Sequence, residues 1–441
     1  MSNPPAPQQV DLALRAAWVL PIEPEGLLVD HVVLVTSGRI VAVLPKAQAA
    51  REYVARETLE FDQHVLMPGL VNAHTHTAMT LLRGIADDVP LDTWLSEHIW
   101  PREARYLTPE FVENGVALGA AEMLLGGTTC CNDMYFYPDA AARAYGAAGM
   151  RAVLGLPVLD FPTPYASDAD AYLKAGLAVR DALRHAPRLS FMLAPHAPYT
   201  VGDASFEQVV TYAHQLDLPI QIHLQETGNE RDEAIARTGE SPLARLDRLG
   251  ATGPAFVAIH AVHLAPGDFD LLAAQRCHIV HCPASNMKLA SGIAPVSRLL
   301  GMGVNVAIGT DSAASNNRLD MFAEMRFASL LAKVATGDAA AVPAMTALRM
   351  ATLGGARALA LEASIGSLVP GKEADMIAVD VSGLGATPMY DPLSHLVHAV
   401  DRESVSDAWV AGEPVMRNRE LVNVDLAAVV ARARLWQHRL G

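Results

Sequence analysis

The middle of the chain alternates short apolar runs with longer helical patterns, from about Met67 to about Ala363. The apolar runs have the length of β-strands, and strands that alternate with helices of this length indicate βαβ units and a parallel sheet. About eight such units match a (β/α)₈ TIM barrel of ~250–300 residues. Strands that are apolar along almost their whole length suit a barrel wall, because both of its faces are buried.

Both ends of the chain have a different pattern, with short alternating β segments and turn signals such as Ser-Gly-Arg. We therefore predict an α/β protein in which a TIM barrel is joined to a composite β-sandwich built from both chain ends. The predicted division is residues 1–66 for the N-terminal part of the sandwich, 67–366 for a metal-dependent hydrolase barrel, and 367–441 for the C-terminal part of the sandwich.

Composition excludes some classes of function. Of the 441 residues 51% are hydrophobic, so a large core is expected, and the balance of 33 basic against 48 acidic residues gives a net charge of −15. This charge repels a phosphate backbone and argues against nucleic acid as a partner. No uninterrupted apolar stretch is long enough to span a bilayer, so no membrane partner is expected.

The N-terminal segment and the cysteines indicate the compartment. The first residues contain neither a basic region nor an apolar core of a signal peptide. The four cysteines are irregularly spaced, which does not fit a disulfide framework. We expect them to be buried free thiols in a cytoplasmic protein.

The pair His74 and His76 follows the first predicted strand of the barrel. Residues i and i+2 of a strand point to the same face, so the two imidazoles can bind one metal ion. Nitrogen ligands suit zinc, iron or nickel. A pair of this kind alone is a weak signal, and its significance depends on the other strands.

Polar, metal-capable residues also follow the later strands. They are His196, His223, Glu226, His260 and Asp311. In a TIM barrel the active site lies at the C-terminal ends of the strands, where these residues would meet His74 and His76. Titratable groups gathered on one rim favour a functional site over a set of unrelated structural residues.

Several motifs carry a resemblance to a known family. NAHTHTAMTLLRG, HLQE, HCPASNMKLASGIAPV, IGTDSAASNN and GSLVPGKEADMIAVD resemble the amidohydrolase superfamily, and within it the 5'-methylthioadenosine/S-adenosylhomocysteine deaminase branch. The resemblance covers nearly the whole chain. It implies that His74, His76, His223 and Asp311 bind one divalent metal ion, with zinc as the first choice and iron or nickel as alternatives. Three histidines and one carboxylate leave room for water, as a catalytic site requires.

The resemblance also implies catalytic roles for Glu226, His260 and Asp311. Glu226 would take a proton from the attacking water, pass it to the ring nitrogen beside the attacked carbon, and help ammonia to leave. His260 would orient the nucleophile, and Asp311 would accept a proton in addition to binding the metal. Glu226 and Asp311 would thus also contact the substrate.

The number of metal ions follows from a missing lysine. Binuclear relatives bridge two metals with a carbamylated lysine on the fourth strand, whereas the corresponding segment here, RLSFMLAPHAPYT, contains no lysine. Lys174 lies in a helical pattern instead. We therefore expect one metal, which favours deamination of a ring amidine.

The segment LDTWLSEHIWPREARYLTPE resembles the lid that covers a purine nucleoside in this branch. The resemblance places Glu103 on both ribose hydroxyls and His196 against the nucleoside, and a carboxylate is a natural acceptor for two hydroxyl donors. Aromatic and methionine side chains near the lid either form an apolar pocket for a thioether or only pack the loops. They are Trp94, Trp100, Met134, Tyr135 and Phe136.

One departure from the family pattern concerns the substrate. Members that accept S-adenosylhomocysteine carry arginines for its carboxylate after the third strand, but GLPVLDFPTPYASDADAY contains none. A carboxylate buried without a cation costs ~2 kcal/mol or more. We therefore expect 5'-methylthioadenosine to be the preferred substrate, with adenosine and S-adenosylhomocysteine as further candidates. Lys288 and Asn286, in SNMKLASG, are assigned no chemistry.

Two alternatives stay open. The first is a mononuclear amidohydrolase that deaminates a free base such as guanine or 8-oxoguanine, or a chlorohydrolase-type triazine enzyme. Glu103 argues against it, because a free base has no diol. The second is a non-catalytic binding barrel, which would be expected to have lost a ligand or the proton shuttle. The family association also suggests a homo-oligomer, dimer or tetramer.

Overall fold

The computed structural model describes residues 6–440. The N-terminal segment, for which we predicted no signal peptide, therefore has its first five residues outside the described part of the chain. Its central element is a sheet of eight parallel strands that follow one another in chain order. These strands are β5 (Leu70–Thr75), β6 (Thr128–Met134), β7 (Arg151–Val158), β8 (Leu189–Pro195), β9 (Ile220–Leu224), β10 (Phe256–His260), β11 (His278–His281) and β12 (Asn305–Ile308). The predicted barrel is confirmed.

The ends of the last and first strands meet and close the barrel. The backbone N–H of Asp311 donates to the carbonyl oxygen of His74 at 3.0 Å. A Cβ atom at Gly309 would lie 2.8 Å from the backbone nitrogen and oxygen of His74, so this approach requires glycine. The closure therefore brings the residues that follow β12 against the histidines that follow β5.

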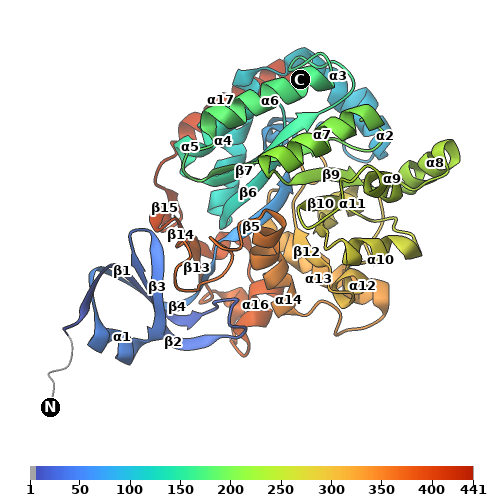
Figure 1. The fold of residues 1–441 in the computed structure, drawn as a ribbon. Coiled ribbons are helices and arrows are strands. Elements are labelled where there is room, and N and C mark those ends of the chain that lie inside the picture. Colours follow the sequence, from blue (N-terminus) through green and yellow to red (C-terminus); the bar gives the residue numbers. More distant parts are fainter. Residues whose placement is uncertain (1–5, 441) are drawn as a thin grey trace.

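Helices surround the strands, as Figure 1 shows. Apart from the helices of the lid, which are described below, the helices between and after the barrel strands are α4 (Pro109–Leu125), α5 (Pro138–Ala148), α6 (Ala169–Leu183), α7 (Asp203–Leu216), α8 (Gly228–Thr238), α9 (Pro242–Arg248), α10 (Pro266–Ala274), α11 (Pro283–Lys288), α12 (Val296–Gly301), α13 (Met321–Thr336), α14 (Ala344–Arg349) and α15 (Gly355–Ala358). All residues of β5, β6 and β7 are buried, as a wall covered on both faces requires.

A second eight-stranded sheet combines both chain ends, in the order β16-β15-β14-β13-β4-β1-β2-β3. Its strands are β1 (Gln8–Val19), β2 (Leu28–Thr36), β3 (Arg39–Pro45), β4 (Tyr53–Pro68), β13 (Met376–Asp380), β14 (Val405–Val410), β15 (Glu413–Arg417) and β16 (Glu420–Leu421). Figure 1 shows its blue N-terminal strands beside the orange-brown C-terminal ones. The sheet bends onto itself, because Gly38 in the β2–β3 turn accepts the backbone N–H of Ala374. The predicted composite β domain is confirmed.

The C-terminal segment also contributes helices. α16 (Pro392–His398) lies between β13 and β14, and α17 (Leu426–Leu440) ends the described chain. Trp436 of α17 packs edge-on against Phe111 of the barrel helix α4, with ring centroids 5.3 Å apart. The last helix therefore contacts the barrel, although it belongs to the segment assigned to the sandwich. The boundaries at residues 66/67 and 366/367 stay predictions.

The predicted lid segment is helical. It forms α2 (Leu91–Thr93), a π-helical stretch (Trp94–Ile99) and α3 (Trp100–Tyr106) after the first barrel strand. Trp94 and Ile99 are buried, which fixes this segment over the C-terminal ends of the strands.

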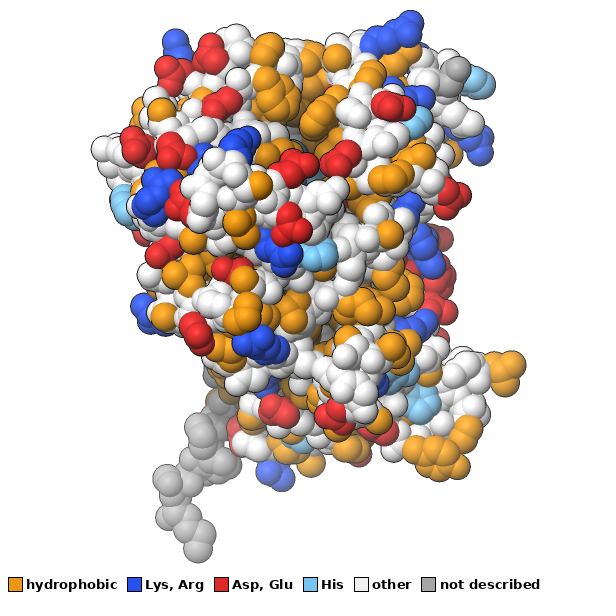
Figure 2. Space-filling view, turned by 90° about the vertical axis from the view of Figure 1, so that its right-hand side faces the viewer, with side chains coloured by type: hydrophobic (Ala, Val, Ile, Leu, Met, Phe, Trp, Pro, Cys, Tyr) orange, Lys and Arg blue, Asp and Glu red, His pale blue; other side chains and the backbone are white. Residues whose placement is uncertain are grey.

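Surface and core agree with the composition. Cys130, Cys131, Cys277 and Cys282 are buried and free, as predicted. On the face drawn in Figure 2, lysine and arginine side chains are scattered among acidic ones. No helix within residues 6–440 is both long and apolar enough to cross a membrane. That nucleic acid and membranes are not partners stays a prediction.

Candidate metal centre and substrate pocket

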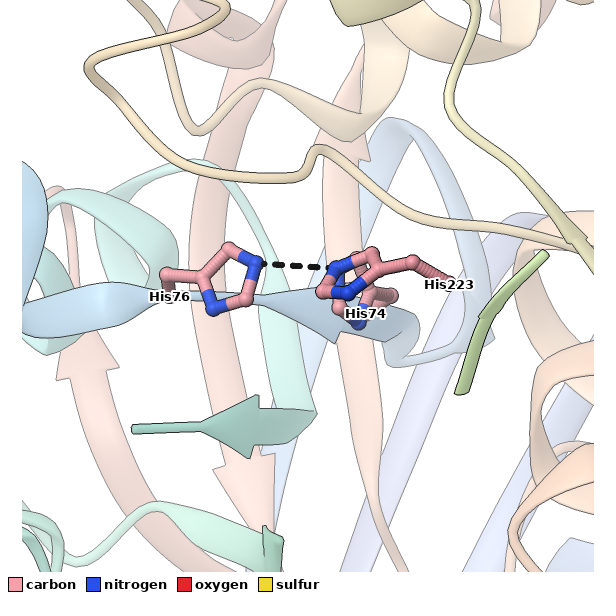
Figure 3. Close-up of side chains that lie close together, drawn as sticks. All are labelled: His74, His76 and His223. Atoms are coloured by element: carbon pink, nitrogen blue, oxygen red, sulfur yellow. Dashed lines mark hydrogen bonds between the residues drawn. The ribbon is translucent and has the colours of Figure 1, made fainter. Parts of the chain in front are cut away.

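Three histidines converge at the C-terminal end of the barrel, as Figure 3 shows. The Nε2 atom of His223 lies 3.2 Å from Nε2 of His74 and 3.3 Å from Nε2 of His76. Oδ1 of Asp311 lies 3.6 Å from Nε2 of His74 and 3.3 Å from Nε2 of His76. The structure thus brings together all four residues predicted to bind the metal.

The protonation of the rings fits a metal ion. Nδ1 of His76 donates to the carbonyl oxygen of Met134 at 2.6 Å, and Nδ1 of His223 donates to the carbonyl oxygen of His196 at 2.7 Å. Burial lowers the pKa of His223 well below its usual range, so Nε2 of this neutral ring carries a lone pair. Burial also acts to lower the pKa of His76, but the hydrogen bond and the charge of Asp311 outweigh it and raise this pKa. Two ring nitrogens that lie 3.3 Å apart and face a carboxylate form a site for a cation. Burial also lowers the pKa of His74 to about 4, which keeps its ring neutral.

The spacing of the four atoms suits zinc. Tetrahedral coordination with bonds of about 2.0–2.1 Å requires ligand atoms about 3.3–3.4 Å apart. The four distances, between 3.2 and 3.6 Å, agree with this requirement. Within the described residues β8 contains no lysine, and Lys174 is exposed on α6, so a bridging carbamate has no source there. The donor set fits one divalent ion.

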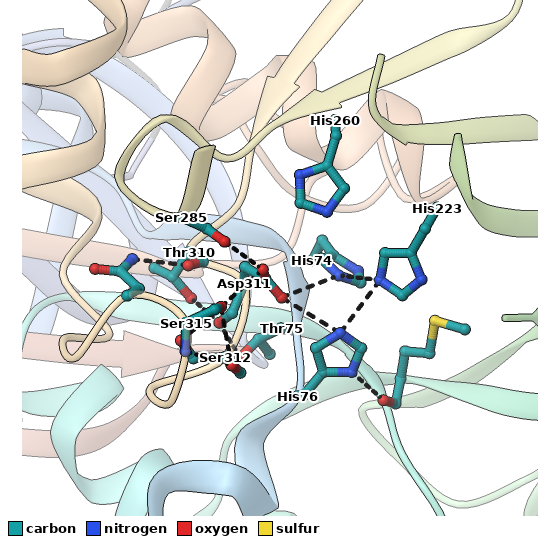
Figure 4. Close-up of polar contacts among 12 residues, drawn as sticks. His74, Thr75, His76, His223, His260, Ser285, Thr310, Asp311, Ser312 and Ser315 are labelled. Carbon is teal, nitrogen blue, oxygen red and sulfur yellow. Dashed lines mark hydrogen bonds and ion pairs between the residues drawn. The ribbon is translucent and has the colours of Figure 1, made fainter. Parts of the chain in front are cut away.

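Asp311 is fixed by two serines that the sequence analysis did not single out. The hydroxyls of Ser285 and Ser315 donate to its Oδ2 at 2.6 and 2.8 Å, which leaves Oδ1 directed at the histidines (Figure 4). Hydrogen bonds to the outer oxygen of a ligand fix its orientation. Both serines lie in motifs quoted for the resemblance, but nothing in those motifs identifies their partner.

Glu226 and His260 lie beside the predicted metal ligands. Oε2 of Glu226 is 3.5 Å from Nε2 of His260, and its Oε1 accepts the hydroxyl of Ser291 at 3.1 Å. Nδ1 of His260 donates to Oδ1 of Asn286 at 2.8 Å. Burial raises the pKa of Glu226 above its usual range, as suits a group that takes up and releases a proton. Asn286, to which the sequence analysis assigned no chemistry, therefore orients His260.

A pocket extends from the predicted metal ligands to the lid. It is lined by His196, Glu226 and Glu103 and by all five aromatic and methionine side chains predicted near the lid. An apolar lining with a few polar groups is typical of a small-molecule site. Within the described residues the lining contains no lysine or arginine.

Glu103 has a partner that sequence reasoning missed. The hydroxyl of Tyr135, which was considered only as an apolar contact, donates to Oε1 of Glu103 at 2.6 Å. Burial raises the pKa of Glu103 to about 7, against the opposite effect of this hydrogen bond. Oε2 has no partner within the described residues, so it is free to accept a hydrogen bond from a ligand in the pocket.

His196 lies between the metal ligands and the pocket. Its carbonyl oxygen holds His223, its Nδ1 is 3.1 Å from Oγ1 of Thr200, and its ring lines the pocket. Burial lowers the pKa of His196 to about 3, so the ring is neutral. All predicted site residues except His74, which contacts His223 and Asp311, therefore line one pocket; their roles stay predictions.

Comparison with protein families gives a match over residues 65–415 to the amidohydrolase family. A relative in Teredinibacter turnerae, named 5-methylthioadenosine/S-adenosylhomocysteine deaminase, is 47% identical over 433 residues, which cover 98% of each chain. A relative in Methanothermobacter thermautotrophicus, named 5'-deoxyadenosine deaminase, is 44% identical over 362 residues, or 81% of this chain and 83% of the relative.

A solved structure of an adenosine deaminase from Xanthomonas campestris with bound zinc is 49% identical and superimposes with a TM-score of 0.97 over 99% of each chain. An atrazine chlorohydrolase from Arthrobacter aurescens, also with zinc, superimposes with a TM-score of 0.90 at 23% identity, over 96% of this chain and 99% of the other. At that identity the second likeness shows a shared fold only.

Proposed function

This chain belongs to the amidohydrolase family, and we propose that it deaminates 5'-methylthioadenosine hydrolytically, with one zinc ion, to the inosine analogue and ammonia. The observation that carries the proposal is the convergence of three histidine Nε2 atoms and Oδ1 of Asp311 at one end of the pocket. The names of the relatives point to adenosine analogues as the substrate class. We also propose that the protein is soluble and cytoplasmic and forms a homo-oligomer. Sedimentation velocity would measure its oligomeric state.

The residues present fit the metal, with His74, His76, His223 and Asp311 as its ligands. A divalent ion held there acts as a Lewis acid that acidifies a water molecule. Ser285 and Ser315 keep the carboxylate of Asp311 turned toward the histidines. The carbonyl oxygens of Met134 and His196 keep two of the rings in the required tautomer.

Proton transfer is assigned to Glu226. As water adds to the ring carbon that bears the amino group, Glu226 takes a proton from the water and gives it to the neighbouring ring nitrogen. When the carbon–nitrogen bond breaks, Glu226 and Asp311 move the remaining proton to the departing ammonia. Asn286 accepts a hydrogen bond from Nδ1 of His260, so Nε2 of His260 faces Glu226 and the reacting water.

Binding of the nucleoside is assigned to Glu103 and His196. The free Oε2 atom of Glu103 accepts the ribose hydroxyls, while Tyr135 holds the other oxygen. The aromatic lining takes the thioether, and the absence of cations in it disfavours a charged tail. Relatives of the deaminase branch are named for both substrates, so the order of preference needs a direct test.

The first test compares deamination of five compounds by the zinc-loaded enzyme, followed by ultraviolet absorbance: 5'-methylthioadenosine, adenosine, S-adenosylhomocysteine, guanine and 8-oxoguanine. We expect 5'-methylthioadenosine to react best, with kcat/KM for S-adenosylhomocysteine at least about tenfold lower, or roughly 1.4 kcal/mol. Equal values for these two would show that the carboxylate has a partner in this chain. Activity on the free bases alone would favour the alternative function, deamination of a free base.

A second prediction concerns Glu103 and pH. The ionised carboxylate accepts two hydroxyl donors, and its pKa of about 7 means that it becomes protonated as the pH falls below neutrality. We therefore expect the preference for a ribonucleoside over its 2'-deoxy analogue, measured as the ratio of kcat/KM values, to fall as the pH is lowered from 8 to 6. Other titrating groups act on both substrates and cancel in this ratio.

Glu103→Gln is the matched variant for this measurement. We expect it to show a small preference that does not change with pH, because the amide does not titrate. A wild-type ratio that stays constant over the same range would contradict the assignment of the diol to Glu103.

A further inference from the structure

Three consecutive residues of α11 contact three different parts of the molecule. The backbone N–H of Ala284 donates to Oε2 of Glu324 at 3.1 Å. Ser285 donates to the metal ligand Asp311, and Asn286 accepts from Nδ1 of His260. A shift of this short helix would therefore displace a metal ligand and the histidine beside the proton shuttle at the same time.

Glu324 also holds the segment that follows β12. It lies in the first turns of α13 and is 1% exposed. Its Oε1 accepts from Nδ2 of Asn316 at 2.7 Å, and the same nitrogen donates to the carbonyl oxygen of Thr310, also at 2.7 Å. Asp311 and Ser315 belong to this segment, so one buried carboxylate joins the two segments that carry the hydrogen bonds to Asp311.

The chemistry of a carboxylate suits this position. Burying it costs free energy unless hydrogen bonds satisfy both oxygens, and here each oxygen has one donor. Burial raises the pKa of Glu324 to about 8, and the two donors act in the opposite direction. Both oxygens of a carboxyl group can accept a hydrogen bond whether the group is ionised or protonated, whereas an amide of the same shape has only one accepting atom and would face a donor with its own NH₂ group.

We propose that Glu324 is a positioning residue for the deamination reaction. It holds α11 and the segment after β12 in the arrangement in which Asn286 orients His260 and Ser285 orients Asp311. The inference rests on the proposed function, because it assigns the reason for the arrangement to catalysis. Glu324 does not line the pocket, so it acts through these residues and not on the substrate.

The test is Glu324→Gln, with Asp407→Asn as the matched control. Asp407 is 5% exposed, lies on β14 of the second sheet and accepts the backbone N–H of Asn418, so it is a buried carboxylate far from the barrel rim. We expect Glu324→Gln to lower kcat by about tenfold or more with KM changed less than threefold, and to speed the loss of zinc to a chelator by a similar factor. Asp407→Asn should change neither quantity by more than about twofold.

Combining variants separates positioning from general loss of stability. If Glu324 acts through α11, Glu324→Gln should lower kcat much less in an Asn286→Ala background than in the wild type. Glu324→Asp, which keeps the carboxyl group on a shorter side chain, should lie between wild type and Glu324→Gln, and it replaces the latter if that variant does not fold. The proposal would be overturned if Glu324→Gln lowered kcat by the same factor in both backgrounds. It would also be overturned if the kcat and the rate of zinc loss of Glu324→Gln were like those of Asp407→Asn. If the wild type deaminates no nucleoside, the proposed function fails, while the zinc-loss measurement still reports on Glu324.

Discussion

Replacing Glu226 by Gln is expected to lower kcat by about 10²- to 10⁴-fold while KM for the nucleoside changes little. The variant keeps the shape of the side chain but removes its ability to take up a proton. Because no atom of Glu226 is among the four that converge on the metal position, the zinc content should stay at the wild-type value. Steady-state kinetics together with metal analysis of the purified variant check both statements.

Glu233→Gln is a suitable control for this variant. Glu233 is exposed on α8, seven residues further along the chain, and the same substitution there should leave kcat within about twofold of the wild type. If the Glu226→Gln variant retained more than about a tenth of the wild-type kcat, another group would have to transfer the proton. A loss of zinc in the same variant would instead place Glu226 in the metal site.

The strands and the rim of the barrel could be predicted because both follow from simple patterns. A parallel barrel strand is apolar along its length, and its C-terminal end is the place where the polar residues of a site gather. His74, His223, His260 and Asp311 follow this rule, since each lies at the end of its strand or within three residues of it. Their convergence therefore depends on topology, which the alternation of strands and helices already indicates.

The partners of these residues could not be predicted in the same way. Ser285 and Ser315 reach Asp311 across 26 and four residues of chain, and these contacts depend on the path of each loop. The backbone of His260 and of Asp311 is left-handed there, with φ of 69° and 58°, which is uncommon for residues other than glycine. Short polar side chains have many local uses in loops, so sequence alone does not select one.

The chain ends show a similar limit. The alternating segments predicted the strands of the second sheet, but the parallel pairing of β1 with β4 requires a crossover, which α1 (Lys46–Glu52) forms within the connection from β3. The contact of α17 with α4 includes the aromatic pair Trp436 and Phe111 and an ion pair between Arg439 and Glu110. An aromatic side chain in a C-terminal helix does not by itself indicate which part of the molecule it will cover.

Removal of the metal should cause the other large effect. Dialysis of the wild type against a strong chelator is expected to reduce activity below about 1%, because the four converging groups then have no ion to bind. It should also lower Tm by a few degrees, since an ion that binds only the folded chain stabilises it by about 4 kcal/mol at a thousand times its Kd. Zinc added back should restore both quantities.

His76→Asn tests whether the histidines hold this ion. The variant should be purified with little zinc, and its low activity and Tm should not respond to chelation or to added zinc. His278→Asn is the matched control, because His278 begins β11 at the opposite end of the barrel. Within residues 6–440 its ring bonds only to the carbonyl oxygen of Pro254 and the side chain of Asn305. A His76→Asn protein with a full complement of zinc would place the ion elsewhere. Recovery of the chelated wild type with iron or nickel but not zinc would change the identity of the metal and leave its four ligands as proposed.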